Sequence, residues 1–173
     1  VYWNMRNKTA KWVALYGMLI SLAFIFSYIE AVIPIPIPVP GVKLGLANLV
    51  SIIGLYTVGI SGTIAVSLVR IVLVGFTFGN LSSMIYSLAG GTVSLILIIL
   101  LKKTGKFSQI GVSIIGGIGH NIGQLTAAVL ITETAGVFYY LPFLIVAGVI
   151  AGAVIGLLGG MVTDRIQNVE KWL

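Results

Sequence analysis

The sequence predicts an all-α membrane protein, a bundle of six transmembrane helices that forms one domain over residues 1–173. Of the 173 residues, 58% are hydrophobic and only 8% are charged, and the mean hydropathy is +1.14. A soluble domain carries about 25% charged residues. Long apolar runs recur along the chain, and the basic residues between them are distributed unevenly. These observations together indicate a multi-pass membrane protein.

The six predicted spans follow from the apolar runs, because a helix needs about 20 such residues to cross a bilayer and fewer where it is short or tilted. We place the spans at about residues 11–33, 44–58, 62–78, 81–101, 110–132 and 139–162. The second and third are separated by little more than Gly59, Ile60 and Ser61. Gly59 and Gly62 favour a tight turn here over one continuous block.

A segment that cannot be helical joins the first two spans. Proline occupies every second position from Pro34 to Pro40. Each proline removes a backbone N–H and pushes the residue before it toward extended geometry. We call residues 34–43 the proline strap. Since the strap is apolar between its prolines, unlike a solvated linker, we predict an extracellular lid, with a passive connector as the alternative.

Basic residues set the predicted orientation. Most of them precede the first span, follow the fourth or follow the sixth: Arg6, Lys8, Lys11, Lys102, Lys103, Lys106, Arg165 and Lys171. With six spans, both termini and the loop after the fourth span face the cytoplasm of a prokaryotic cell. Lys43, Glu30 and Glu133 then face the outside.

Polar side chains gather in the outer half of the predicted bundle. We placed each by a helical rise of about 1.5 Å per residue. The outer half or outer surface holds Glu30, Lys43, Asn48, Asn80, Ser82, Ser83, Tyr86, Glu133, Tyr139 and Tyr140, whereas the cytoplasmic halves of the second, fourth and sixth spans are almost purely aliphatic. A pore would be polar through its whole depth, so the pattern predicts a pocket that is open to the outside and closed below.

Arg70 lies near the middle of the third span, where a charge costs at least about 2.5–3.5 kcal/mol on insertion scales. By residue counting, Glu30 and Glu133 lie at other depths, too far away for ordinary contact. Two explanations stay open. Either Arg70 donates to carbonyl groups and to Tyr or Asn side chains, or an anionic ligand supplies the opposite charge.

The fifth span has an unusual glycine-rich run that ends in His120, Asn121 and Gln124. Each glycine weakens a helix by up to about 1 kcal/mol relative to alanine. His120 and Gln124 are one turn apart and share a face, with Asn121 beside them. Glycine leaves space around these polar groups, which favours a binding role over a purely structural one.

Small residues form two stripes. Gly148, Gly152, Gly156 and Gly160 share one face of the last span, and we expect that face to pack inside the bundle rather than to form a dimer. Ala10 and Ala14 begin a second stripe near the cytoplasmic end of the first span.

Several function classes lack a sequence signature. The chain has no cysteine, one histidine and four acidic residues, so no metal site, catalytic carboxylate pair or cofactor is predicted and we expect no enzyme. No nucleotide-hydrolysing motif is present, so the chain cannot drive transport alone. The net charge of +6 follows the predicted topology and does not indicate nucleic-acid binding.

Several segments carry a resemblance to a known family: GVKLGLAN after the prolines, RIVLVGFTFGN, SLAGG and GHNIGQL. Together with six spans in this length, they resemble the Gx transporter family, also called heptaprenyl diphosphate synthase component I. This family is similar in turn to the substrate-binding S components of energy-coupling factor (ECF) transporters. The resemblance covers nearly the whole chain.

The resemblance implies a substrate site in the extracellular half beneath the first outer loop. It implies that Ala10 and Ala14 face a transmembrane T component that carries two ATPases. The synthase name fits the residues poorly, because prenyl synthases bind diphosphate through magnesium on clustered aspartates, and the only aspartate here is Asp164 at the cytoplasmic end.

Two functions follow from the sequence. The first is capture of a small anionic or amphipathic molecule, such as a vitamin or flavin or a quinone or isoprenoid precursor. Its candidate substrate-binding residues are Lys43, Asn48, Arg70, Asn80, Tyr86, His120, Asn121, Gln124 and Tyr139. The alternative is a membrane subunit that anchors, or supplies lipid to, a prenyl-transferring or electron-transfer complex. A groove open sideways to lipid favours the alternative, and a closed outer pocket favours the first.

Overall fold

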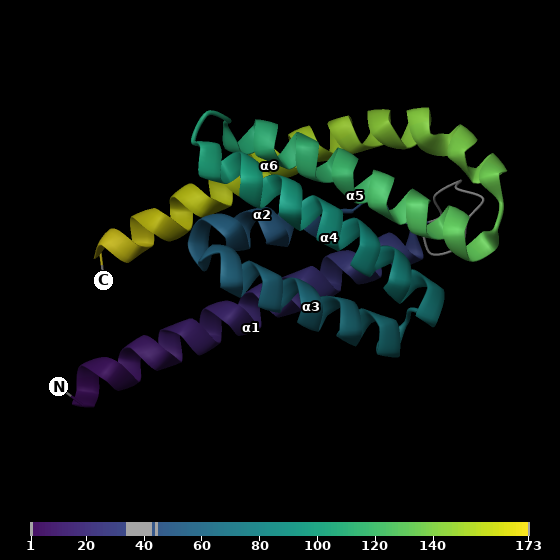
Figure 1. The fold of residues 1–173 in the computed structure, drawn as a ribbon. Helices are drawn as coiled ribbons and strands as arrows, with labels where there is room; N and C mark the ends of the chain where they lie inside the picture. The colour runs from purple at the N-terminus through teal and green to yellow at the C-terminus, as the bar shows by residue number, and fades with distance from the viewer. Residues whose placement is uncertain (1, 34–42, 44, 173) are drawn as a thin grey trace.

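The protein folds as a helical bundle (Figure 1). The computed structural model describes residues 2–33, 43 and 45–172, with side chains for residues 10–33, 43 and 45–166. Residues 34–42 of the proline strap, and the side chains of Arg6, Lys8 and Lys171, lie outside this description. The elements are α1 (Tyr2–Val32), α2 (Asn48–Thr57), α3 (Gly59–Thr77), α4 (Leu81–Thr104), α5 (Gln109–Thr132), the 3-10 helix η1 (Ala135–Tyr140) and α6 (Leu141–Trp172).

Within the described residues, five segments rather than six are long and apolar enough to cross a membrane. They are Ala10–Val32, Gly59–Thr77, Leu81–Thr104, Gln109–Thr132 and Ala135–Ile166. The predicted span at 44–58 is helical only over the 10 residues of α2. Such a helix is about 15 Å long, half of the roughly 30 Å hydrocarbon core. The prediction of six full spans is corrected here, because a short apolar run is equally typical of a buried core helix.

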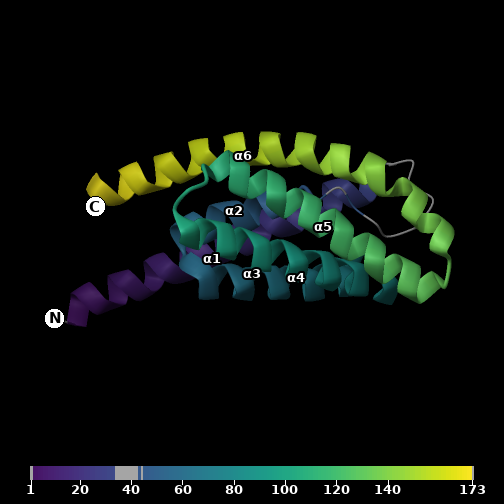
Figure 2. The same ribbon diagram turned by 45° about the horizontal axis from the view of Figure 1, so that its top comes forward.

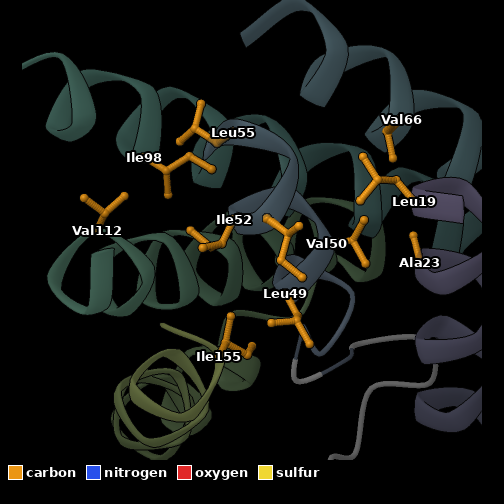
Figure 3. Close-up of a cluster of buried hydrophobic side chains, with 11 residues drawn as sticks. Leu19, Ala23, Leu49, Val50, Ile52, Leu55, Val66, Ile98, Val112 and Ile155 are labelled. Atoms are coloured by element: carbon orange, nitrogen blue, oxygen red, sulfur yellow. The ribbon is translucent and has the colours of Figure 1, made fainter. Parts of the chain in front are cut away.

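The short helix α2 forms the centre of the bundle. All of its residues from Asn48 to Leu55 are buried. Figure 3 shows its apolar side chains surrounded by residues of every other α-helix, and the cluster consists of Leu19, Ala23, Leu49, Val50, Ile52, Ile53, Leu55, Val66, Ile98, Val112 and Ile155. A helix that is apolar on all sides is typically enclosed by protein. The surrounding helices therefore separate α2 from the lipid.

Local signals fix the ends of the long helices. Asn80 and Ser83 form a capping box at the start of α4, in which the Ser83 amide donates to Asn80 Oδ1 over 2.8 Å and the Asn80 amide donates to Ser83 Oγ over 2.9 Å. The helix ends at Gly105, whose φ of 65° is the left-handed conformation typical of a helix terminus. Ser108 then caps α5 by accepting a hydrogen bond from the Gly111 amide over 3.2 Å.

α5 lies between α4 and α6 and packs against both (Figure 2). The glycine stripe of α6 forms one of these contacts. A Cβ added at Gly152 would lie 2.6 Å from Ile114 Cα, and one added at Gly156 would lie 2.6 Å from Ile110 Cα. Gly148 meets α5 in the same way, whereas a Cβ at Gly160 would have only Gln109 Oε1 nearby, at 3.9 Å. The prediction that this stripe packs inside the bundle is thus confirmed for its first three glycines.

The connections between helices are divided between the two ends of the bundle. In Figures 1 and 2, both termini and the α4–α5 connection lie at one end, and the α5–η1 turn lies at the other. This arrangement puts Lys102, Lys103 and Lys106 on the same side as both termini. The side of the membrane that they face stays a prediction.

Single cysteines test that orientation, and the chain has no native cysteine to interfere. Thr134 and Lys106 are exposed at opposite ends and avoid the left-handed backbone of Glu133 and Gly105. We expect Thr134→Cys to react with an impermeant thiol reagent added outside intact cells, and Lys106→Cys to react only after lysis. If only Lys106→Cys were labelled in intact cells, the orientation would be the opposite of the predicted one.

Candidate functional site

The backbone that leads into α2 lies inside the bundle without being helical. Lys43, Gly45 and Ala47 are buried, and Gly45 has a φ of 90°. Irregular backbone at membrane depth requires partners from the protein itself. Glu30 of α1 supplies them, because its Oε1 accepts from the amides of Gly45 over 2.5 Å and of Leu46 over 2.8 Å. A carboxylate just before a helix N-terminus is also favoured by the helix dipole.

Gly45 is required here for two reasons. Its φ lies in the left-handed region that L side chains rarely adopt. In addition, a Cβ at this position would lie 2.8 Å from Asn48 Nδ2 and 3.1 Å from His120 Cδ2. The glycine therefore lets the entering chain pass between the first turn of α2 and the middle of α5.

Arg70 of α3 is buried, with 6% of its surface exposed. Its Nη1 donates to Ser27 Oγ of α1 over 3.3 Å, and its charge interacts with the Glu30 carboxylate one turn further along α1. Within the described residues Arg70 makes no ion pair at contact distance. Glu30 nevertheless lies near enough for its charge to act on Arg70, which a count of residues along the helices does not show.

Hydrogen bonds connect Lys43, the last residue of the proline strap, to α5. The backbone amide of Lys43 donates to Gln124 Oε1 over 3.0 Å. The other end of that amide group, Nε2, therefore donates to His120 Nε2, which lies 2.8 Å away. Because His120 Nε2 accepts, the imidazole is neutral and its proton sits on Nδ1. His120 and Gln124 share a face as predicted.

Gly90 of α4 makes room for this pair. A Cβ at Gly90 would lie 2.6 Å from Gln124 Cγ, 2.7 Å from the His120 carbonyl oxygen and 3.0 Å from His120 Nδ1. Gly90 of the SLAGG segment thus belongs to a close α4–α5 contact, whereas a Cβ at Gly91 would meet only Ile71 of α3, at 3.6 Å.

Lys43 adds a second cation, and it is buried. Its Nζ lies 5.9 Å from the centre of the Phe78 ring, which contacts Phe24 and Tyr28 edge to face at 5.2 and 5.4 Å between ring centres. Burial lowers the pKa of Lys43 below its usual value, and the Glu30 carboxylate opposes that shift.

Seven side chains from four helices and the strap thus converge where α2 begins. We call them the buried polar cluster: Ser27, Glu30, Lys43, Asn48, Arg70, His120 and Gln124. Within the described part of the chain, four atoms of the cluster are buried and have no hydrogen-bond partner: Glu30 Oε2, Asn48 Nδ2, Arg70 Nε and His120 Nδ1. Buried polar atoms are nearly always paired in folded proteins. Unpaired donors and an unpaired acceptor in one cluster are a feature of a ligand site.

Four of the predicted substrate-binding residues lie outside the cluster. Asn80 caps α4 and is exposed, and Tyr139 on η1 is 89% exposed. Tyr86 packs in a second apolar core with Leu125 and Leu144. Asn121 is fully buried but faces α6, where its Nδ2 donates to the Leu144 carbonyl over 2.7 Å.

Three members of this arrangement were not among the predicted site residues. The sequence analysis places Glu30 at the outer surface and assigns no role to Ser27 or to Gly45. The available signal is an acid near the end of the first span together with a non-helical entry to the next helix. Backbone amides at a helix N-terminus lack helical partners, so a carboxylate from a neighbouring helix can accept from them.

An apolar groove lies apart from the cluster, on the outward face of α4 and α5. Its volume is about 480 Å³. Aliphatic side chains and two threonines line it: Ile85, Leu88, Ala89, Thr92, Val93, Ile122, Gly123, Thr126, Ala127 and Leu130. Leu88 and Ile122 are partly exposed on this face, so the groove opens sideways, where a membrane helix meets lipid.

Among the described residues, no group of three His, Cys, Asp or Glu side chains lies close enough together to hold a metal ion.

Five membrane-length apolar helices around a buried charged cluster define a multi-pass membrane protein with a polar interior site. The profile of the heptaprenyl diphosphate synthase component I family matches residues 19–162, a range that includes the whole buried polar cluster. The chain therefore belongs to that family. Comparison with curated proteins and with solved structures gives no match.

Proposed function

We propose that this protein is a substrate-binding membrane subunit of the energy-coupling factor type, which captures a small anionic or amphipathic molecule from the outer side. The observation that carries the proposal is the buried polar cluster, in which two cations and four unpaired polar atoms lie around the buried N-terminus of α2. Vitamins, flavins and quinone or isoprenoid precursors fit this description. The role is binding and not catalysis.

Helix geometry supports an anionic ligand. The N-terminus of α2 carries a partial positive charge, and helix termini of this kind bind anions. In membrane transporters, broken or short helices commonly direct their N-termini at an anionic group of the substrate near the bilayer centre. Here Arg70 and Lys43 add full positive charges beside that terminus, and the proline strap precedes it in the chain.

Mass spectrometry of the purified protein tests this proposal. We expect the wild-type protein to release a small molecule on denaturation. The double variant Arg70→Gln/Glu30→Gln should lose it, because the neutral amides remove both charges while the side chains stay polar. The matched control Arg165→Gln/Glu133→Gln changes exposed residues and should retain it. Equal ligand content in both double variants would contradict a site at the cluster.

The coupling partner in this proposal is a membrane T component with two ATPases, since the chain has no motif for nucleotide hydrolysis. Ala10 and Ala14 would form its docking face on α1. Both are exposed, and a Cβ at Gly17 on the next turn would meet nothing within 4 Å. The small side chains would let a partner helix approach closely.

Bulky substitutions test the docking face. Ala10→Trp and Ala14→Trp should leave the melting temperature and the bound molecule unchanged, because both positions lie far from the cluster in the chain and are exposed. They should abolish co-purification with the T component and ATPases. Val13→Trp, at a position that is 67% exposed on another face of the same turn, is the control. Loss of the bound molecule in the alanine variants would instead place the stripe within the internal packing.

The apolar groove of α4 and α5 favours a second candidate function. A sideways groove of about 480 Å³ suits an acyl or prenyl chain, as expected of a subunit that anchors or supplies lipid to a prenyl-transferring or electron-transfer complex. The name of the family agrees with that role. Co-purification of a long-chain lipid that survives the Arg70→Gln/Glu30→Gln change would favour this candidate.

A further inference from the structure

We infer that the buried polar cluster binds a head group with one negative charge, of the carboxylate class, and not a phosphate or diphosphate. This inference rests on the proposed capture function and specifies the ligand of the same site. It follows from the charges that the fold brings together at the start of α2.

The cluster has a net charge of one positive unit. Arg70 and Lys43 are cations, and we count Glu30 as an anion, because its Oε1 accepts hydrogen bonds from two backbone amides, over 2.5 and 2.8 Å, at the N-terminus of α2. His120 contributes no charge, since its Nε2 accepts the hydrogen bond from Gln124. Residues 34–42 and Leu44 add no charge to this count, because none of them has an ionisable side chain.

A buried site favours a ligand that brings its net charge close to zero, since an uncompensated charge away from water is costly. A carboxylate neutralises the cluster. A doubly charged phosphate monoester or a diphosphate would leave excess negative charge. The described residues offer no group of three acids or histidines that would hold a compensating metal ion.

The unpaired hydrogen-bonding atoms agree with this charge. Arg70 Nε and Asn48 Nδ2 are buried donors without a partner in the described residues. A carboxylate presents two oxygens that accept such bonds, and a bond with one charged partner is among the stronger kinds. His120 Nδ1, which carries the imidazole proton, is a third unpaired donor. Glu30 Oε2 is an unpaired acceptor, so it suits a hydroxyl or amine of the ligand near the carboxylate.

Thermal unfolding in detergent with four probes tests the inference at equal ionic strength. The probes are benzoate, its neutral isostere benzamide, inorganic phosphate and pyrophosphate. We expect benzoate to raise the melting temperature of the wild-type protein by a few degrees, and the other three to have no effect. Stabilisation by pyrophosphate or phosphate above that by benzoate would overturn the inference. Equal stabilisation by benzamide would do so as well, because the charge would then have no role.

Glu30→Gln raises the net charge of the cluster to two positive units and should shift the preference toward phosphate. The matched control is Glu133→Gln, which changes an exposed acid and should respond like the wild type. An unchanged preference in Glu30→Gln contradicts the charge count. If that variant does not fold, the wild-type comparison of the four probes decides alone.

The outcomes separate this inference from the proposed function. Loss of the co-purified molecule in Arg70→Gln/Glu30→Gln, together with a wild-type response to pyrophosphate, would leave capture intact and remove the carboxylate assignment. A wild-type protein with no co-purified molecule and no response to any probe would remove both.

Discussion

Replacing Gly152 by alanine is expected to destabilise the protein toward the upper end of about 1–3 kcal/mol, the range for overpacking a tight contact. The added Cβ would lie 2.6 Å from Ile114 Cα and 2.9 Å from the Ser113 carbonyl oxygen. Both are backbone atoms, so relief requires α5 and α6 to separate. The same helix pair holds Asn121 against Leu144, and α5 carries His120 and Gln124.

Reversible unfolding in mixed micelles measures this effect, with Gly160→Ala as the matched control. Gly160 lies on the same stripe, but its added Cβ would have only Gln109 Oε1 nearby, at 3.9 Å. We expect Gly160→Ala to leave the free energy of unfolding unchanged or to raise it by up to about 1 kcal/mol, because alanine favours a helix over glycine and no packing is altered. Equal effects at both positions would mean that the stripe does not make the α5–α6 contact described here.

Replacing Glu30 alone is expected to cost about 3–5 kcal/mol, because two cations then stay buried without a counter-charge, and replacing Arg70 alone is expected to cost less, because Lys43 still balances Glu30. Arg70→Gln leaves Glu30 with Lys43 as its only cation in the cluster. Glu30→Gln leaves Arg70 and Lys43 repelling each other. The double variant should lose much less than the sum of the two single changes, since no unpaired charge of the pair is left.

A double-mutant cycle on the free energy of unfolding measures this coupling. Arg165→Gln with Glu133→Gln is the control pair, and its effects should add. Additive effects at Arg70 and Glu30 would mean that the two charges do not interact, and the charge count of the cluster would then fail.

Sequence reasoning located the long helices well but mistook α2 for a span. The predicted spans at 62–78, 81–101 and 110–132 agree closely with α3, α4 and α5, because length and hydropathy suffice where a helix contacts lipid. The run at 44–58 is just as apolar. Hydropathy cannot distinguish lipid from a protein interior, and only the surrounding helices reveal that α2 is enclosed.

The candidate site was predictable only where helical spacing alone determines which residues lie together. His120 and Gln124 share a helical face, and helical spacing is enough to show this. The position of Glu30 at the start of α2 depends on its side-chain length and on the left-handed backbone of Gly45. Neither is contained in a count of residues along a helix. Asn121 was grouped with His120 because it is adjacent in sequence, although the next residue on a helix points about 100° away.

An experimental map of the protein, purified from its own membranes without added ligand, tests the central claim most directly. We predict density for a bound small molecule in contact with Arg70 and Asn48 at the start of α2, close to the Lys43 ammonium. Density confined to the apolar groove of α4 and α5, with Arg70 Nε and Asn48 Nδ2 paired by the protein itself, would contradict the account.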